Sequence, residues 1–236
     1  MLPKIDSPVM TMTMPSTNKK VKYKQFTIKE QKAIMAASEG SDDETVINTI
    51  IQVLTNCVEG YDFAKAPLFD LEYAFAKLRS ASAGETTVMR HTCQNKVDDV
   101  DCGTTNEVLI NINDIKIDIP HKDKFMVKIN DTMSLKLKYV VAEDAVTLMN
   151  ESIGTSELYE MIAKSIDIIA TDEDAIKVEY NDELIAWCDD LPENTVKSII
   201  QFIKDTPRAT MKVEYVCTAC NHEHSMDIQG INNFLE

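Results

Sequence analysis

The stretch Val213–Gln229 reads VEYVCTACNHEHSMDIQ: an extended run, a Cys-x-x-Cys turn and a second extended run. The earlier stretch Thr86–Ile112, TTVMRHTCQNKVDDVDCGTTNEVLINI, has the same order. Each stretch places two cysteines at its turn, and Zn²⁺ in proteins favours four tetrahedral ligands that are often thiolates. The two stretches are therefore predicted to form two β-hairpins whose turns share one metal ion. That ion would join the two ends of the long segment between them.

The second turn has the spacing of a zinc knuckle, whereas the first turn is wider. Eight residues separate Cys93 from Cys102, against about two to four in most structural zinc sites. The intervening residues are polar and acidic, which favours an exposed loop. Gly103 and Asn221 follow the second cysteine of each turn, where a left-handed backbone is often needed. The predicted metal ligands are Cys93, Cys102, Cys217 and Cys220.

Four thiolates leave no open coordination position for water, so a Zn²⁺ ion bound here would be structural. Three alternatives stay open. Cys217 and Cys220 could form a redox pair, although a thioredoxin-type pair opens a helix and HEHSMDIQ is extended. A histidine could replace one cysteine, with His222 better placed than His91 or His224. The thiols could also carry no metal.

Length and composition indicate a globular protein. The chain has 236 residues, 44% of them hydrophobic and 27% charged, enough for one large domain or two small ones. No apolar run is long enough for a transmembrane helix, and MLPKIDSPVM lacks the apolar core of a secretory signal. We expect a cytosolic compartment, where six cysteines indicate metal ligands or buried thiols rather than disulfides.

Charge is unevenly distributed along the chain. The net charge of −15 argues against nucleic-acid binding. Residues 1–40 hold seven lysines and three acidic residues, so they carry +4 and the remainder carries −19. A basic N-terminal ribbon on an acidic body predicts a complementary contact, within the chain or with a neighbouring subunit. The alternative is a solvated edge strand that its lysines protect.

The N-terminal part is predicted to be a hairpin followed by helices. Val9–Met14 alternates Met and Thr, and a second strand begins at Val21 after a polar turn. The methionines would pack on the chain's own helices or on a partner. Thr27 and Glu30 form a capping box, which predicts a helix over 28–38.

Two more helices are expected before residue 84. Ser41 or Asp42 caps the first, and Asp70 is expected to cap the second. Gly40 and Gly60 mark the ends of the helices that precede them. The apolar face of the first is predicted to comprise Val46, Ile47, Ile50, Ile51, Leu54, Cys57 and Val58.

Short strands and then helices are predicted for the rest of the chain. Strands are expected at 86–91, 107–119, 125–129, 133–139, 210–216 and 224–229. Helices are expected at 156–169 and after Pro192, with a short strand or irregular link at 176–180. Cys188, next to Trp187, is predicted to be buried.

The sequence holds no recognisable catalytic motif. Patterns typical of nucleotide-binding loops, hydrolase nucleophile elbows and zinc proteases are absent. The acidic clusters fall at predicted helix ends or loops, where capping and solvation explain them. His121 is expected in a loop. These residues predict a binding or structural protein rather than an enzyme.

Three stretches resemble the baseplate hub protein family of T-even-like contractile-tailed bacteriophages. They are IDSPVMTMTMPSTNKKVKYKQFTIKEQKAIMAA (5–37), LFDLEYAFAKLRSASAGE (68–85) and CTACNHEHSMDIQGINNFLE (217–236). The resemblance rests on the Pro3–Pro8 segment, the Met-Pro-Ser-Thr strand end, the basic strand Val21–Glu30 and the closing cysteine knuckle. It is strongest over residues 3–85 and 213–235. The wide turn between Cys93 and Cys102 departs from the family pattern.

The resemblance implies a non-enzymatic structural or assembly protein of the tail baseplate hub. Its partners would be other hub or tail proteins, with oligomerisation inside the hub and neither nucleic acid nor a membrane span involved. The protein would occupy the host cytoplasm during assembly and then the virion tail baseplate. Two alternatives are a tail assembly chaperone absent from the mature virion and a zinc-ribbon adaptor of another complex.

The predicted fold class is α+β. An N-terminal hairpin and helical domain (1–84) precedes a split zinc-ribbon-like pair of hairpins (85–112 and 210–236). An inserted strand-then-helix subdomain (113–209) separates the two halves of the ribbon.

Overall fold

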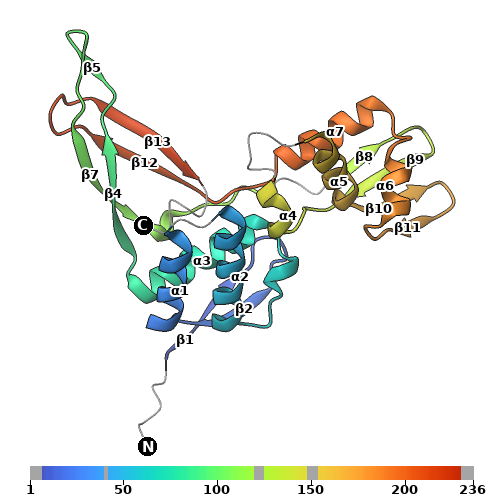
Figure 1. Ribbon diagram of the computed structural model, residues 1–236, viewed down its shortest axis with the longest axis horizontal. Coiled ribbons are helices and arrows are strands. Elements are labelled where there is room, and N and C mark those ends of the chain that lie inside the picture. Colours follow the sequence, from blue (N-terminus) through green and yellow to red (C-terminus); the bar gives the residue numbers. More distant parts are fainter. Residues whose placement is uncertain (1–6, 40–41, 120–124, 148–153, 230–236) are drawn as a thin grey trace, which may run out of the picture. The chain divides into compact units, whose positions relative to one another are not determined.

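The computed structural model describes residues 7–39, 42–119, 125–147 and 154–229 (Figure 1). The chain divides into two compact units. Unit 1 comprises Met1–Phe63, Phe69–Ile117 and Arg208–Glu236, and unit 2 comprises Ala64–Leu68 and Asp118–Pro207. The expectations for Gly40, Ser41 and His121 lie outside the described residues. Within those residues, no helix combines the length and apolarity needed to cross a bilayer.

A three-stranded antiparallel sheet opens unit 1. Its order is β1-β2-β3, with β1 at Val9–Thr13, β2 at Lys20–Lys24 and β3 at Val58–Glu59. The predicted hairpin is confirmed, and Met12 and Met14 are buried in the chain's own core. The alternative, in which lysines protect an edge strand, does not apply to β2, because it lies between the other two strands.

Three helices accompany this sheet and carry many of the buried side chains of unit 1. They are α1 (Ile28–Ser38), α2 (Asp43–Cys57) and α3 (Leu68–Ala83), with a 3₁₀ turn at Phe63–Lys65. The capping box of Thr27 with Glu30 and the cap by Asp42, whose carboxylate accepts the Thr45 N–H at 2.7 Å, are both confirmed. Val58, predicted as helical, begins β3 instead, because it pairs with Tyr23.

The sequence predicted that Asp70 caps α3, and this prediction is wrong. The helix begins earlier, at Leu68, directly after Pro67, whose ring disfavours a helical residue before it. Asp70 is therefore inside the first turn and its side chain is fully buried. Its carboxylate accepts hydrogen bonds from the Ser16 N–H and hydroxyl and from the Tyr61 hydroxyl. The acidic side chain thus fastens the β1–β2 turn to α3.

Two long hairpins complete unit 1 (Figure 1). One pairs β4 (Thr86–Thr92) with β7 (Thr105–Asn111), and the other pairs β12 (Thr210–Val216) with β13 (Glu223–Gln229). Their inward faces form one core together with part of α3. Its members are Ala76, Val108, Ile110, Ile112, Ile115, Ala209, Met211, Val213 and Ile228.

β7 is shorter than predicted. The strand was expected to reach Ile119, but it ends at Asn111 and a 3₁₀ turn follows at Ile112–Asp114. The Asn111 side-chain oxygen accepts the Asn113 N–H at 2.9 Å, which is the local bond by which asparagine favours a turn over a strand. Lys116 then forms a single antiparallel bridge with Thr210, so both halves of the ribbon meet at their bases.

A buried ion pair links α3 to the start of β12. Glu72, fully buried, receives hydrogen bonds from Arg208 Nε at 2.9 Å and from the Ala209 N–H at 2.7 Å. A second guanidinium nitrogen of Arg208 lies 2.8 Å from the same carboxylate. Because both carboxylate oxygens of Glu72 accept hydrogen bonds from residues 208 and 209, the helix fixes where the second hairpin begins.

Unit 2 is a four-stranded antiparallel sheet with helices. The sheet order is β11-β10-β9-β8. Its strands are β8 (Met126–Lys128), β9 (Met133–Leu137), β10 (Ile166–Thr171) and β11 (Ala175–Lys177). Its helices are α4 (Ala142–Thr147), α5 (Thr155–Ser165), α6 (Asp182–Cys188) and α7 (Glu193–Lys204). Cys188 is buried, as predicted.

The predicted helix over 156–169 is wrong at its C-terminal end. Helix α5 ends at Ser165, and Ile166–Thr171 pairs with β9 as a strand. The sequence of this strand, IDIIAT, is rich in β-branched residues, which pack well on a sheet. With these corrections to individual elements, the α+β class is confirmed, with its N-terminal hairpin, its helices and its split pair of long hairpins.

Candidate metal centre

The four cysteines predicted as ligands lie at the tips of the two long hairpins. Cys93 directly follows β4 and Cys102 lies shortly before β7, while Cys217 directly follows β12 and Cys220 precedes β13. All six cysteines of the chain are free thiols. Since the hairpins pack through their inward faces, the two tips are held together.

The two tips share one backbone frame although their lengths differ. The N–H of Cys217 donates to the carbonyl of His222 at 2.9 Å. In the first tip, the N–H of Cys93 donates to the carbonyl of Thr104, also at 2.9 Å. In both cases the acceptor is the second residue after the second cysteine, so each tip is closed by the same bond.

A left-handed residue completes each frame. Gly103 has φ of 62° and Asn221 has φ of 56°, as their positions after the second cysteine predicted. The N–H of Gly103 donates to the Cys93 carbonyl at 3.1 Å, and that of Asn221 donates to the Cys217 carbonyl at 3.0 Å. The turns therefore aim both cysteine pairs in the same way, because equivalent bonds constrain them.

The extra residues of the first tip form a small hairpin of their own. β5 (Lys96–Val97) pairs with β6 (Val100–Asp101). Asp98 and Asp99 have φ of 52° and 64°, the two positive values of a type I′ turn. The Cys102 N–H donates to the Asn95 carbonyl at 2.8 Å and closes this hairpin at its base. The insertion is exposed, as predicted, and projects from an intact knuckle.

The four sulfur atoms are spaced as metal ligands. All four lie within 4.8 Å of one another, with 3.7 Å between Cys93 and Cys220 and 3.9 Å between Cys102 and Cys217. A tetrahedron of thiolates about 2.3 Å from Zn²⁺ has edges of about 3.8 Å. Both of these sulfur–sulfur contacts run between the hairpins, so one ion placed among the four sulfurs would join the two halves of the ribbon.

The pKa values of the cysteine thiols favour the binding of a cation by the cluster. Burial raises the pKa of Cys93 to about 12, whereas the N–H groups of Cys220 and Ala219 lower the pKa of Cys217 to about 6. Cys217 is thus the thiol that ionises most readily. Like charges so close together resist further ionisation, and a divalent cation removes that resistance.

Asn106 connects the two tips, and the sequence analysis missed it. It lies on β7 and is 3% exposed. Its side-chain oxygen accepts from the N–H and the hydroxyl of Thr218, at 2.9 and 3.0 Å. Its side-chain nitrogen donates to the Thr104 carbonyl at 3.1 Å and to the Cys217 sulfur at 3.5 Å. One buried amide therefore positions a ligand of one hairpin from the other hairpin.

Two further side chains contact sulfur atoms. The Asn95 amide donates to the Cys220 sulfur at 3.7 Å, and His224 Nε2 lies 3.2 Å from the Cys93 sulfur. Both contacts again cross between the hairpins. A nitrogen donor such as the Asn95 amide orients a thiolate and stabilises its charge, in the way that surrounding groups tune metal ligands.

Three of the four histidines form a cluster beside the four sulfurs. The ring of His224 stacks on Tyr215 with centroids 4.7 Å apart, and His91 Nδ1 lies 2.5 Å from the Tyr215 hydroxyl. His222 meets His224 edge to face at 4.7 Å. Within the described residues, the group of ligand atoms close enough for one ion contains the four cysteines and no histidine.

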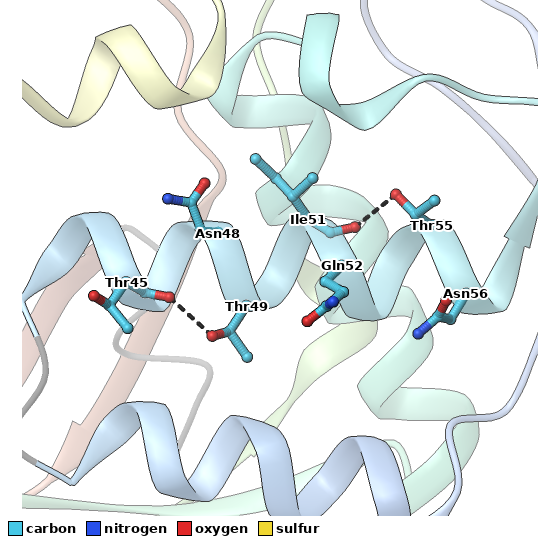
Figure 2. Close-up of a pocket in the computed structure, with 7 residues that line it drawn as sticks. All are labelled: Thr45, Asn48, Thr49, Ile51, Gln52, Thr55 and Asn56. Atoms are coloured by element: carbon cyan, nitrogen blue, oxygen red, sulfur yellow. Dashed lines mark hydrogen bonds between the residues drawn. The ribbon is translucent and has the colours of Figure 1, made fainter.

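A second concave region lies on α2 (Figure 2). This groove of about 540 Å³ is lined by Thr45, Asn48, Thr49, Ile51, Gln52, Thr55 and Asn56. The hydroxyls of Thr49 and Thr55 donate to carbonyls of their own helix, at 2.9 and 2.7 Å. Since none of its side chains is acidic, basic, imidazole or thiol, this groove offers no proton donor or acceptor suited to neutral pH.

The described residues thus contain two separate features: a thiolate cluster suited to holding a metal, and a groove that lacks titratable groups. A family model described as T4 bacteriophage base plate protein matches residues 7–236. The chain belongs to this family. No curated protein and no solved structure shows a significant match.

Membership makes the chain a structural protein of the phage baseplate, which acts with other tail and baseplate proteins. The predicted resemblance to tail baseplate proteins is confirmed at this level. The finer assignment to the hub stays a prediction. The matched residues include both cysteine hairpins and the whole of unit 2, so the baseplate protein is matched across its full architecture.

Proposed function

We propose that this baseplate protein is a non-enzymatic subunit or assembly factor of the baseplate hub, which acts by protein–protein contacts and is held together by one structural Zn²⁺ ion. The family match over residues 7–236 supports the baseplate role, and the resemblance of residues 3–85 and 213–235 to hub proteins supports the hub assignment. The four-sulfur cluster carries the second.

Zinc is the metal that this donor set fits best. Four cysteine sulfurs at distances near the edge of a ZnS₄ tetrahedron are typical of structural zinc sites. Such a set leaves no position for a reacting water. The bound ion would supply folding free energy, because the ligands are brought together only in the folded chain.

The ion would act as a clasp. In this proposal, residues 85–112 and 210–236 form a ribbon domain, residues 1–84 form the N-terminal domain, and residues 113–209 are the inserted subdomain. Joining Cys93 and Cys102 to Cys217 and Cys220 fixes both ends of the insertion. A subunit that must keep its shape while neighbours assemble on it benefits from such a closure.

The role in the hub is tested by quantitative mass spectrometry of purified virions together with cross-linking of the baseplate. We expect the chain in mature particles at a fixed ratio to other hub proteins, cross-linked to proteins of the central hub. Its presence in assembly intermediates but absence from particles would identify a chaperone. Cross-links confined to peripheral baseplate proteins would overturn the hub assignment.

A further inference from the structure

The outward face of the β1-β2-β3 sheet is cationic, although the protein is acidic. Side chains alternate along β2, so Val21 and Tyr23 are buried while Lys20, Lys22 and Lys24 are exposed. Successive residues on one face of a strand are about 6.7 Å apart, so the three ammonium groups span about 13 Å. We call this surface the lysine face.

The neighbours of the lysine face neutralise it only in part. Thr13 and Thr11, which are uncharged, lie opposite Lys20 and Lys22 on β1. The one acidic neighbour on β3 is Glu59, which lies opposite Lys22 in the strand register and has its carboxylate 3.9 Å from the Lys24 ammonium. Within the described residues, neither Lys20 nor Lys22 takes part in an ion pair.

Protection of a sheet edge does not explain these lysines. Lysines that prevent unwanted strand pairing lie on edge strands, and β2 is the central strand. The strand at the edge, β1, reads VMTMT and has no charge at all. Lys22 lies where β2 pairs with a strand on each side, so its charge is presented on the face of the sheet rather than at an edge.

Helix α6 presents the complementary charge pattern. Asp182 and Glu183 in its first turn, and Asp189 and Asp190 after its last, are all exposed. Residues seven apart share one side of a helix and are about 10 Å apart along it. These carboxylates thus form an acidic row on the side opposite the buried Leu184. No ion pair involves this row within the described residues.

We propose that the lysine face docks against the acidic row of α6 in a second copy of the chain. The row and the face have opposite charge and similar length, which selects partner and register. The two surfaces differ, so the contact is heterologous, with one of each on every copy. It uses neither the four cysteines nor the groove on α2, and its test is independent of the hub assignment.

Sedimentation of the purified full-length chain tests for the contact. Self-association is expected at concentrations up to ~100 μM in low salt, and it should weaken at least about tenfold in high salt because exposed charges are screened. A chain that stays monomeric under both conditions overturns the proposal. Equal association in both salt conditions overturns it as well.

Charge reversal tests which surfaces meet. The variant Lys20→Glu/Lys22→Glu and the variant Asp189→Lys/Asp190→Lys should each lose at least about tenfold in association. An equimolar mixture of the two should associate again, because each supplies the surface that the other has lost. Failure of the mixture to associate contradicts the proposal.

Matched controls separate this contact from a general effect of charge. Lys29→Glu/Lys32→Glu on α1 and Asp172→Lys/Glu173→Lys at the β10–β11 turn change the same number of exposed charges elsewhere. Both are expected to associate like the wild type, and equal losses in the controls would overturn the proposal. The neutral variant Lys20→Gln/Lys22→Gln, checked by circular dichroism, gives an intermediate loss and guards against misfolding beside Glu59.

Discussion

The side-chain oxygen of Asn106 accepts two hydrogen bonds from Thr218, one from its N–H at 2.9 Å and one from its hydroxyl at 3.0 Å. Asn106 belongs to the first hairpin and Thr218 to the Cys-x-x-Cys turn of the second. The same amide donates to the sulfur of Cys217. The alignment of the two knuckles therefore depends on a neutral side chain as well as on the cysteines.

Replacing Asn106 by alanine should weaken both the fold and the metal site. The change removes the hydrogen bonds of a buried amide, including the one that accepts the Thr218 N–H, so we expect a loss of about 1–3 kcal/mol in the free energy of unfolding. Loss of the donor to Cys217 should weaken metal affinity by about 10–100-fold. Urea unfolding and competition with a chelator measure the two effects.

The matched control is Asn56→Ala, on the exposed side of α2. It should change stability by no more than about 0.5 kcal/mol and leave metal affinity unaltered. If Asn106→Ala retains wild-type affinity, Asn106 does not position the ligands.

Deleting residues 96–101 should leave the metal site intact. The deletion converts the first tip into Cys-Gln-Asn-Cys, the length of the second tip. The bonds that define the knuckle frame, from Cys93 to Thr104 and from Gly103 to Cys93, lie outside the deleted segment. We expect the metal content per chain to be unchanged, as measured by elemental analysis. Loss of the metal would show that the inserted hairpin is part of the site.

Removing Arg208 should destabilise unit 1 strongly. Arg208→Met leaves the buried Glu72 carboxylate without its cation, and breaking a buried pair in this way costs roughly 3 kcal/mol or more. The double variant Glu72→Gln/Arg208→Met should recover part of the loss, because no charge is then buried. A double-mutant cycle from urea unfolding measures the coupling, and purely additive losses would argue against a functioning pair.

The stability contributed by Asp70 should depend on pH. Burial raises the pKa of this carboxyl, although hydrogen bonds from Ser16 and Tyr61 act in the opposite direction. The folded state thus holds the proton more tightly than the unfolded state. The resulting stabilisation is complete below the unfolded pKa of about 3.9, and it is lost as the pH rises through the raised folded pKa.

The variant Asp70→Asn lacks this pH-dependent stabilisation, because its side chain does not titrate. The difference in unfolding free energy between wild type and Asp70→Asn should therefore favour wild type most at acidic pH and shrink as the pH rises. Urea unfolding across the acidic range measures it, and Asp131→Asn on an exposed turn is the matched control. A difference that stays constant with pH would contradict a raised pKa for Asp70.

Features determined by local sequence were predictable. The capping box at Thr27, the left-handed residues Gly103 and Asn221, and the two cysteine-bearing turns each depend on residues close together in the chain. The chemistry of those residues also restricts what the backbone can do. For the same reason the hairpins that carry the cysteines could be placed from the alternation of their side chains.

Features determined by distant contacts were not predictable. Asn106 and Thr218 are 112 residues apart in the chain, so no local pattern links them. One signal was present: Asn106 occupies an inward position of β7, alternating with exposed residues, where the other inward residues, Val108 and Ile110, are apolar. A polar residue on the buried side of a strand needs a partner.

Ambiguous patterns explain the two main errors. An acidic residue near the start of a helix can be the cap or can lie in the first turn, so Asp70 was placed outside α3. The isoleucines of Ile166–Thr171 suit either a buried helix or a strand. The segment forms a strand because it pairs with β9, where Ile169 lies opposite Leu135. The local sequence does not reveal this pairing.

The metal content of the purified full-length protein tests the central claim most directly. Elemental analysis should give one Zn²⁺ per chain for wild type and for Cys57→Ser and Cys188→Ser, whose buried thiols lie outside the cluster. Cys93→Ser and Cys217→Ser should lose most of the zinc and melt at a lower temperature. Substoichiometric zinc in the wild type, or unchanged melting temperatures of both cluster variants, would contradict the claim that one structural Zn²⁺ ion joins the two hairpins.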